Sequence, residues 1–232
     1  VLLDSGNLFK AEETGLIEKL DKAGVPVVFI DFRRNATENT VPSLLILGRV
    51  LGEEKGAAAF IDFYIAEMKK VANVIDNIPA EERPLVVIEN AAGGQPDVCC
   101  WSFGPYNYGR FVELAADPDH VIGTGANWAE AKPEVTSTLL GYEGDPAVNA
   151  EKIEALAARP GFAELRAVKD GNYHSIYHQF YNSPYHFVAI QQIAKWLYPD
   201  DFEDLDPQDT FNRLHDKFMP YEASGQLWLS AN

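Results

Sequence analysis

The stretch EEKGAAAFIDFYIAEMKKVANVIDNI, residues 53–78, decides how the chain is organised. Its apolar side chains recur at steps of three and four residues, the spacing of one face of an α-helix; they are Phe60, Tyr64, Met68, Val71, Ile75 and Ile78. At 1.5 Å per residue such a helix is about 35 to 40 Å long, close to the width of a whole domain. Because strand-forming sequence lies on both sides of it, we expect a spine that joins two lobes.

The sequence before this helix predicts part of an α/β lobe. We expect strands over residues 1–3 and 25–30, and helices over residues 12–23 and 41–51 that end at Gly24 and Gly52. Two strands and two helices cannot cover both faces of a parallel sheet, so residues 1–52 read as the remnant of a lobe. Val1 opens directly on an apolar triplet, without an initiator Met or a signal-peptide pattern. We therefore expect that the chain starts partway through a longer precursor.

The sequence after the helix alternates strands and helices. Strands are expected over residues 85–89, 120–124 and 173–177, and helices over residues 108–116, 147–158, 184–198 and 207–218. Such alternation predicts a mostly parallel sheet, with ligands bound at the carboxyl ends of its strands, here the loops after Glu89, Thr124 and Tyr177. The expected fold is α/β, with two Rossmann-like lobes joined by a long rigid helix. The expected parts are residues 1–52, 53–78 and 79–232.

Composition excludes several classes of protein. The 232 residues are 47% apolar and 23% charged, which excludes a disordered chain. With 19 basic and 35 acidic residues the net charge is −16, so the surface repels phosphate backbones and nucleic-acid binding is not expected. No apolar run approaches the roughly 20 residues of a membrane-spanning helix.

Familiar enzyme motifs are absent from the sequence. It has no phosphate-binding loop, no Gly-x-Ser-x-Gly elbow, no His-Glu-x-x-His and no pair of Cys-x-x-Cys knuckles. Gly123-Thr-Gly125 begins like a dinucleotide fingerprint, but Trp128 stands where the next glycine belongs. The adjacent Cys99 and Cys100 could form a strained disulfide, stay a free pair or simply be small apolar residues in a turn; two neighbours are too few for zinc.

The densest candidate site is YHSIYHQFYNSPYHF, residues 173–187. Six of these fifteen residues are aromatic and three are histidines, and the loop after the strand offers the imidazole, phenol and amide groups of His178, Tyr181 and Asn182. These groups either touch a ligand or pack the junction between helix and sheet. His186 and His215 fall within helices and are expected to be surface or packing residues.

The other two candidate loops also carry aromatic residues, which could contact a flat or greasy ligand or plug the loops; they are Trp101, Tyr106 and Trp128. Positive charge is scarce in this chain. An arginine near the site would therefore complement an anionic ligand, or else be a solvated surface charge, and the residues concerned are Arg33, Arg34 and Arg110.

With these residues in view, the chain resembles the class III periplasmic substrate-binding proteins of ABC importers, which handle ferric siderophores, haem and cobalamin. The resembling stretches are Gly24–Asp31, Thr40–Ile78 with Leu47-Gly48-Arg49-Val50-Leu51-Gly52, and Ala92-Gly93-Gly94 through Cys99-Cys100 to Tyr108-Gly109-Arg110-Phe111. The tail is the most specific, with His178-Gln179, Asn182-Ser183-Pro184, Ala194-Lys195-Trp196-Leu197 and Asp206-Pro207. Members of this family carry a further stretch of chain before the position of Val1, and usually a Gly-rich segment and a helix between the positions of Ala116 and Asp117.

The resemblance implies a binding protein, not an enzyme, that captures an iron complex between two lobes and delivers it to a membrane permease. It implies a monomer in the periplasm without a cofactor. The ligand contacts are expected from Trp101, Tyr106, Arg110, Trp128, His178, Tyr181 and Asn182, and His178 or Tyr181 could ligate iron directly. Glu12 or Glu13 matches a permease-docking position; the alternative is an ordinary carboxylate at a helix start, where the helix dipole favours it.

Two other functions remain open at this point. A doubly wound enzyme could use His178 as general base on a small metabolite. A signalling or scaffold protein could reuse the same lobes.

Overall fold

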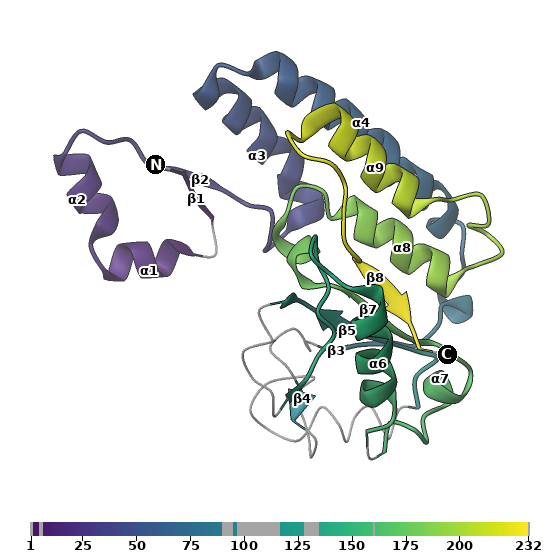
Figure 1. The fold of residues 1–232 in the computed structure, drawn as a ribbon. Helices are drawn as coiled ribbons and strands as arrows, with labels where there is room; N and C mark the ends of the chain where they lie inside the picture. Colours follow the sequence, from purple (N-terminus) through teal and green to yellow (C-terminus); the bar gives the residue numbers. More distant parts are fainter. Residues whose placement is uncertain are drawn as a thin grey trace. The chain divides into compact units, whose positions relative to one another are not determined.

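The structure is a computed structural model, which describes residues 2–4, 7–89, 95–96, 117–127, 135–159 and 161–231. The chain divides into two compact units. The amino-terminal unit consists of residues 1–73 and 180–190, and the carboxyl-terminal unit consists of residues 74–179 and 191–232. The chain passes between the units near the end of a long helix and again on either side of residues 180–190 (Figure 1).

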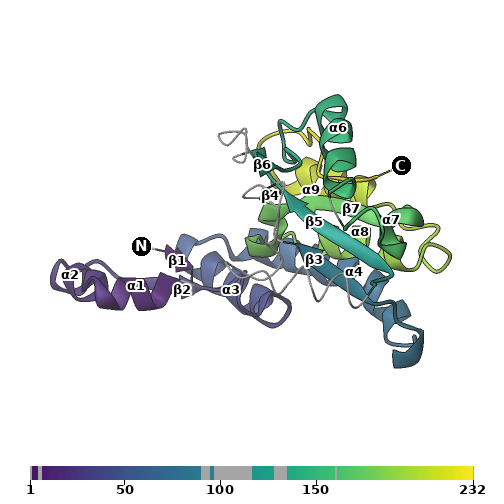
Figure 2. The same ribbon diagram turned by 90° about the horizontal axis from the view of Figure 1, so that it is seen from below.

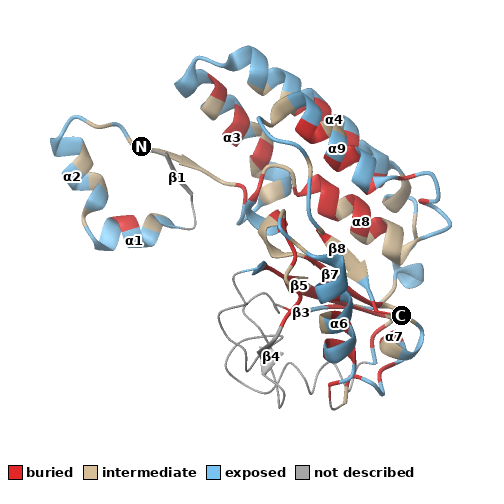
Figure 3. Cartoon of the chain, viewed as in Figure 1, coloured by how far each residue is buried: buried red, intermediate tan, exposed pale blue. Residues whose placement is uncertain are grey.

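The amino-terminal unit begins with a short parallel strand pair. Strand β1 (Leu2–Asp4) pairs with β2 (Val28–Ile30), and helices α1 (Leu8–Glu13) and α2 (Leu16–Lys22) connect them. We predicted one helix over residues 12–23, which is wrong because Gly15, at φ 62°, breaks it in two. None of the seven described residues of α2 is buried (Figure 3).

Two longer helices follow in the same unit. Helix α3 (Ala36–Leu51) ends at Gly52 in the left-handed conformation, as predicted, but it begins earlier than expected and runs through Pro42. Helix α4 (Glu54–Ile75) is the long helix that the opening stretch predicts. The two approach closely at Gly48, where an added Cβ would lie 2.6 Å from the Cβ of Ala57. Phe32, Leu44 and Ile61 form the small core that this approach closes.

Residues 180–190 complete the amino-terminal unit. Phe187 packs edge-to-face on Phe63 and Tyr64 of α4, with ring centres 5.8 and 5.7 Å apart. Nothing in the sequence pattern indicates that a segment so late in the chain belongs to this unit, because the contact is non-local.

The carboxyl-terminal unit is built on a four-stranded sheet in the order β3-β5-β7-β8. Strands β3 (Val86–Glu89), β5 (His120–Gly125) and β7 (Tyr173–Tyr177) are parallel, as predicted, and Figure 2 shows them side by side. We did not predict the antiparallel edge strand β8 (Trp228–Ser230), whose three residues are too few for a clear alternation. A separate antiparallel pair joins β4 (Gln95–Pro96) to β6 (Val135–Thr136).

The helices of this unit cover both faces of the sheet. Side chains alternate along β7, so Tyr173 and His174 point to opposite faces. Tyr173 packs in one core with Ile153 and Leu156 of α6 (Pro146–Ala157), whereas His174 stacks on Trp196 of α8 (Phe187–Leu197). The other described helices of this unit are α7 (Arg166–Lys169) and α9 (Pro207–Phe218), with the 3₁₀ turn η2 (Ala80–Glu82). The 3₁₀ turn η4 (His178–Asn182) begins in this unit and ends in the amino-terminal unit.

Helix starts in this unit follow capping rules that the sequence carries. Asp145 and Asp206 cap α6 and α9, each accepting a backbone N–H with its side chain, and a proline follows each of them. The predicted bounds of β7 and α9 are confirmed. The predicted helix over residues 108–116 lies outside the described residues.

Candidate functional site

The candidate site lies at the carboxyl edge of the parallel strands in the carboxyl-terminal unit. Glu89 of β3 is in register with Gly123 of β5, and Gly125 of β5 with Tyr177 of β7, so the three strands end at one edge. Open α/β sheets bind ligands at such an edge. Of the three loops that leave it, the turn after β7 lies within the described part of the chain.

His178 is the first residue after β7. Its Nδ1 lies 3.0 Å from the hydroxyl of Thr124, the penultimate residue of β5, and the imidazole is half-buried. This hydrogen bond fixes the orientation of the ring at the edge of the sheet, and the hydroxyl can donate or accept according to the tautomer. The sequence placed His178 in this turn but gave no sign of Thr124 as its partner.

Tyr181 and Asn182 belong to the amino-terminal unit, and both are exposed, Tyr181 at 41%. The guanidinium of Arg33 lies over the phenol ring of Tyr181, 5.1 Å from its centre. An exposed cation–π contact of this kind is worth about 0.5–1 kcal/mol. It brings together two of the residue types that the sequence singled out, a ring and a scarce positive charge.

The backbone beside Arg33 is fixed by the residue that follows β2. Asp31 accepts the backbone N–H groups of Arg33 and Arg34 with one carboxylate oxygen, at 3.0 and 2.8 Å, and its other oxygen accepts from the side chain of Asn39 at 2.8 Å. A turn closed by an aspartate therefore presents Arg33 at the surface of the amino-terminal unit.

Other predicted contacts lie outside the described residues. These are Trp101, Tyr106, Arg110 and Trp128, together with the adjacent Cys99 and Cys100.

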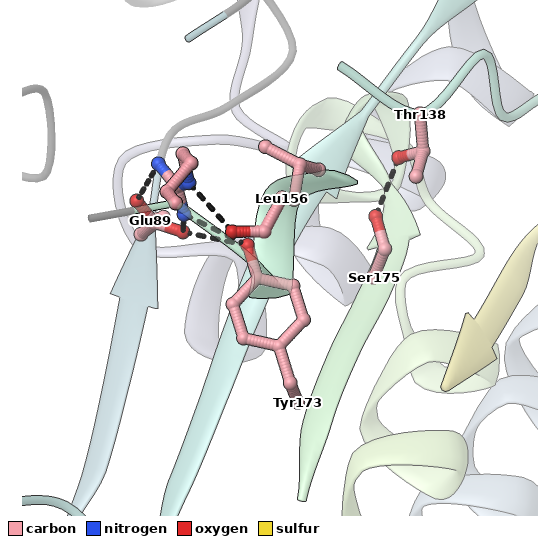
Figure 4. A network of polar contacts seen from close by, with 6 residues as sticks. Glu89, Thr138, Leu156, Tyr173 and Ser175 are labelled. Atoms are coloured by element: carbon pink, nitrogen blue, oxygen red, sulfur yellow. Dashed lines mark hydrogen bonds and ion pairs between the residues drawn. The ribbon is translucent and has the colours of Figure 1, made fainter. Parts of the chain in front are cut away.

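A buried polar network lies beneath the edge, and the sequence gave little sign of it (Figure 4). Arg159 donates to both carboxylate oxygens of Glu89, at 3.0 and 2.7 Å, and to the carbonyl of Leu156 at 2.8 Å. The hydroxyl of Tyr173 donates to Glu89 at 2.9 Å and accepts from Arg159 at 3.0 Å. Burial first, then the Glu89 carboxylate, raises the pKa of Tyr173 well above its ordinary value.

The two glycines of β5 leave room for this network. Gly123 lies in register between Glu89 and Ser175, where a side chain would stand between them. A Cβ on Gly125 would overlap the hydroxyl of Thr138, which is hydrogen-bonded to Ser175 at 2.6 Å. The Gly123-Thr-Gly125 pattern begins like a nucleotide fingerprint, but here its glycines leave space for polar side chains to pack against one face of the sheet.

Sequence reasoning also missed an aromatic cluster at this edge. Tyr142 packs edge-to-face on Tyr177 and on Tyr221, with ring centres 6.5 and 5.7 Å apart, and Tyr221 is 51% exposed. The hydroxyl of Tyr142 lies 3.0 Å from Nε2 of His215, whose Nδ1 lies 2.8 Å from the carbonyl of Phe211. The three tyrosines are far apart in the sequence, so no local pattern joins them.

His186 and His215 are buried packing residues, one of the two roles we predicted for them. Nε2 of His186 lies 3.2 Å from the hydroxyl of Tyr64, and its Nδ1 lies 3.0 Å from the carbonyl of Ser183. Burial lowers the pKa of His186.

Glu12 and Glu13 are exposed at the end of α1. The alternative that they are carboxylates at a helix start is therefore wrong, since the dipole disfavours negative charge at a helix end. Glu12 lines a hollow of about 550 Å³ in the amino-terminal unit, together with Glu18 and Asp21 and with the apolar Ile17, Val25 and Val27. The hollow thus combines acidic and apolar side chains.

The described residues lack a metal-binding cluster and a membrane-spanning helix. They contain no group of three histidine, cysteine, aspartate or glutamate side chains placed to hold a metal ion. None of their helices has the length and apolar character needed to cross a membrane.

The fold is that of TroA-like periplasmic binding proteins. The chain superposes on the TroA-like periplasmic binding protein FepB from Veillonella parvula with a TM-score of 0.83 and 24% identity, over 100% of this chain and 72% of that one. The molybdate-binding protein MolA of Haemophilus influenzae matches at a TM-score of 0.61 and 14% identity, over 90% and 70% of the two chains. The haem-binding protein BhuT, solved with two haems, matches at 0.58 and 17%, over 85% and 74%.

Each of these three structures is described as a periplasmic binding protein. No family model matches the sequence, and no curated protein matches it. The resemblance that the sequence carries is thus confirmed at the level of the fold.

Proposed function

We propose that the chain is the substrate-binding component of an ABC importer, a non-enzymatic protein that captures an iron chelate in the periplasm and delivers it to a membrane permease. The observation that carries the proposal is the likeness to TroA-like binding proteins over the whole chain, at a TM-score of 0.83 with FepB. Within this proposal residues 1–52 belong to the amino-terminal lobe, residues 53–78 to the connecting helix and residues 79–232 to the carboxyl-terminal lobe, except that residues 180–190 pack with the amino-terminal unit. The protein acts as a monomer.

The ligand is proposed to be an anionic iron chelate. The Arg33 guanidinium over the exposed Tyr181 ring offers positive charge next to an aromatic face, in a chain of net charge −16. His178, oriented by Thr124, offers an imidazole that could complete the coordination of iron where the chelator leaves a position free. The proposed contacts are Trp101, Tyr106, Arg110, Trp128, His178, Tyr181 and Asn182.

Binding is tested by titrating the protein with a ferric siderophore, haem and molybdate while Trp fluorescence is followed. We expect quenching by an iron chelate. Tight binding of molybdate beside no response to either iron complex would overturn the iron assignment. Turnover of a metabolite by the purified protein, abolished by His178→Ala, would overturn the transport proposal itself.

The contribution of His178 is separated from that of the fold by two variants. His178→Ala is expected to weaken binding of the iron chelate about tenfold or more, the effect of losing one good polar anchor. The matched control is Glu164→Ala on an exposed surface pair with Lys169, which should bind like the wild type. Equal affinity of both variants would remove His178 from the proposed site.

Glu12 and Glu13 are proposed to dock on arginines of the permease. Their exposed carboxylates and the acidic side chains of the neighbouring hollow suit a basic partner. Reversing both charges, Glu12→Lys with Glu13→Lys, should weaken capture by permease-containing vesicles and leave chelate binding unchanged. Unchanged capture would exclude this docking position.

A further inference from the structure

His174 of β7 contacts residues of two other strands and of a helix in the carboxyl-terminal unit. Its Nε2 lies 3.2 Å from Nδ1 of His120 on β5, and its Nδ1 lies 2.7 Å from the hydroxyl of Ser230 on β8. Its ring stacks on Trp196 of α8, with centres 4.4 Å apart and planes 7° apart. His174 is 4% exposed and His120 is 8% exposed, so the pair is held away from water.

The two imidazoles satisfy both hydrogen bonds without a buried charge while each carries a single proton. Either His174 donates to His120 and accepts from Ser230, or His120 donates to His174, which then donates to Ser230. One extra proton still leaves a donor facing an acceptor between the rings, but it buries a charge. A second extra proton places two N–H donors opposite each other, on Nδ1 of His120 and Nε2 of His174, which lie 3.2 Å apart, so the hydrogen bond between the rings is lost.

The charged groups around the pair give it little compensation. Asp119, next to His120, already binds Arg166 of α7 at 2.8 Å and accepts the backbone N–H of Leu85 beside β3 at 2.7 Å. On α8 the ammonium of Lys195 donates to the carbonyls of Glu203 and Leu205.

Three further titratable groups near the sheet have other partners. Glu89 and Arg159 bind each other, and alternation along the strands puts them on the face opposite His174. His215 of α9 binds Tyr142 and the Phe211 carbonyl instead. Burial therefore dominates at the pair. It lowers the pKa of His120 against a smaller opposing effect of Asp119, and with the neighbouring His120 it lowers that of His174 to about 3.

We propose that the His120–His174 pair is an acid-sensitive lock, which holds β5, β7, β8 and α8 together while it is neutral and releases them when protons enter it. The unfolded chain takes up these protons more readily than the folded chain. The stability that the neutral pair provides is therefore complete above pH 6.5, the pKa of histidine in the unfolded chain, and is lost as the pH falls toward 3.

The lock is tested by comparing the pH dependence of unfolding in two variants. From pH 7 to pH 4, His174 alone should lower the folding equilibrium constant of the wild type about two hundredfold, because its pKa is 6.5 in the unfolded chain and about 3 in the folded chain. His174→Gln should lose this share of the pH dependence. The matched control His215→Gln removes another buried histidine of the same unit and should keep it. Equal pH dependence in wild type and His174→Gln would overturn the proposal.

A measurement on the wild type decides the question if His174→Gln does not fold. The ¹⁵N shifts of the His174 ring should report a neutral imidazole down to pH 5, and Trp196 fluorescence should change only at more acidic pH. A His174 ring that takes up its proton near pH 6.5 in the folded protein would equally overturn the proposal.

Discussion

Two imidazole hydrogen bonds join the same two strands at opposite ends. At the amino end of β5, His120 bonds His174, two residues beyond Asn172, which lies across from His120 when the register of Val121 with Tyr173 is continued. At the carboxyl end, Thr124 bonds His178, again two residues beyond its register partner Ile176. The diagonal step is the same, but both imidazoles of the first pair are buried, whereas His178 is half-buried at the carboxyl edge of the sheet. Burial, and not the contact itself, thus separates a structural histidine from a candidate binding residue.

The largest expected effect comes from the opposite face of the same sheet, where burial is combined with full charge. Arg159→Ala leaves the Glu89 carboxylate buried without its bidentate partner and should lower the free energy of unfolding by about 3–5 kcal/mol. Denaturant unfolding measures the loss. The control Arg166→Ala removes the half-exposed ion pairs of Arg166 with Asp117 and Asp119 and should cost at most about 1 kcal/mol. Similar losses in both variants would mean that burial does not set the scale here.

Truncating each histidine tests directly whether the two ends of the strands differ in stability. His174→Ala removes a stacked ring and leaves His120 and Ser230 without a partner each, so it should cost about 2–4 kcal/mol. His178→Ala removes the hydrogen bond to Thr124 at a half-buried position and should cost about 1 kcal/mol. If His178→Ala proved as costly as His174→Ala, His178 would be a packing residue and its place in the proposed site would be lost.

The sequence predicts much of this sheet because its signals are local. The apolar run before Glu89, the alternation over residues 173–177 and the Asp-Pro starts of α6 and α9 each depend on neighbouring residues. The partners of the polar groups depend on register between strands far apart in the chain. Nothing near Glu89 in sequence indicates Arg159, 70 residues away.

The candidate site was predictable to a similar degree. The turn with His178 follows a clear strand, whereas the partner of its ring comes from another strand, 54 residues earlier. The contact of Arg33 with Tyr181 depends on residues 180–190 joining the amino-terminal unit, which no periodicity reveals. Residue type singled out both side chains, but only the fold pairs them.

The glycine at the carboxyl end of β5 tests how tightly the polar layer is packed there. Gly125→Ala places a Cβ against Thr138 and should cost about 1–3 kcal/mol through overpacking. The control Gly56→Ala lies on an exposed part of α4 with nothing within 4 Å of the new Cβ, and should stabilise the protein by up to about 1 kcal/mol. The two variants are compared by thermal unfolding. A neutral Gly125→Ala would show that residues 137–139 can move away from the strand.

The smallest change is also the most specific test of the His178 end, because Thr124→Val removes one hydroxyl and keeps the volume. Thr124→Val takes the partner from Nδ1 of His178 and should cost about 1 kcal/mol of unfolding free energy, whereas Thr124→Ser keeps the bond. The ¹⁵N shift of that nitrogen should therefore change in Thr124→Val and stay near the wild type in Thr124→Ser. If His178 anchors the proposed iron chelate, the affinity should follow the shift: weakened in the valine variant and retained in the serine variant. Two variants that differ in shift but bind the chelate equally would show that the orientation of His178 is a property of the fold alone.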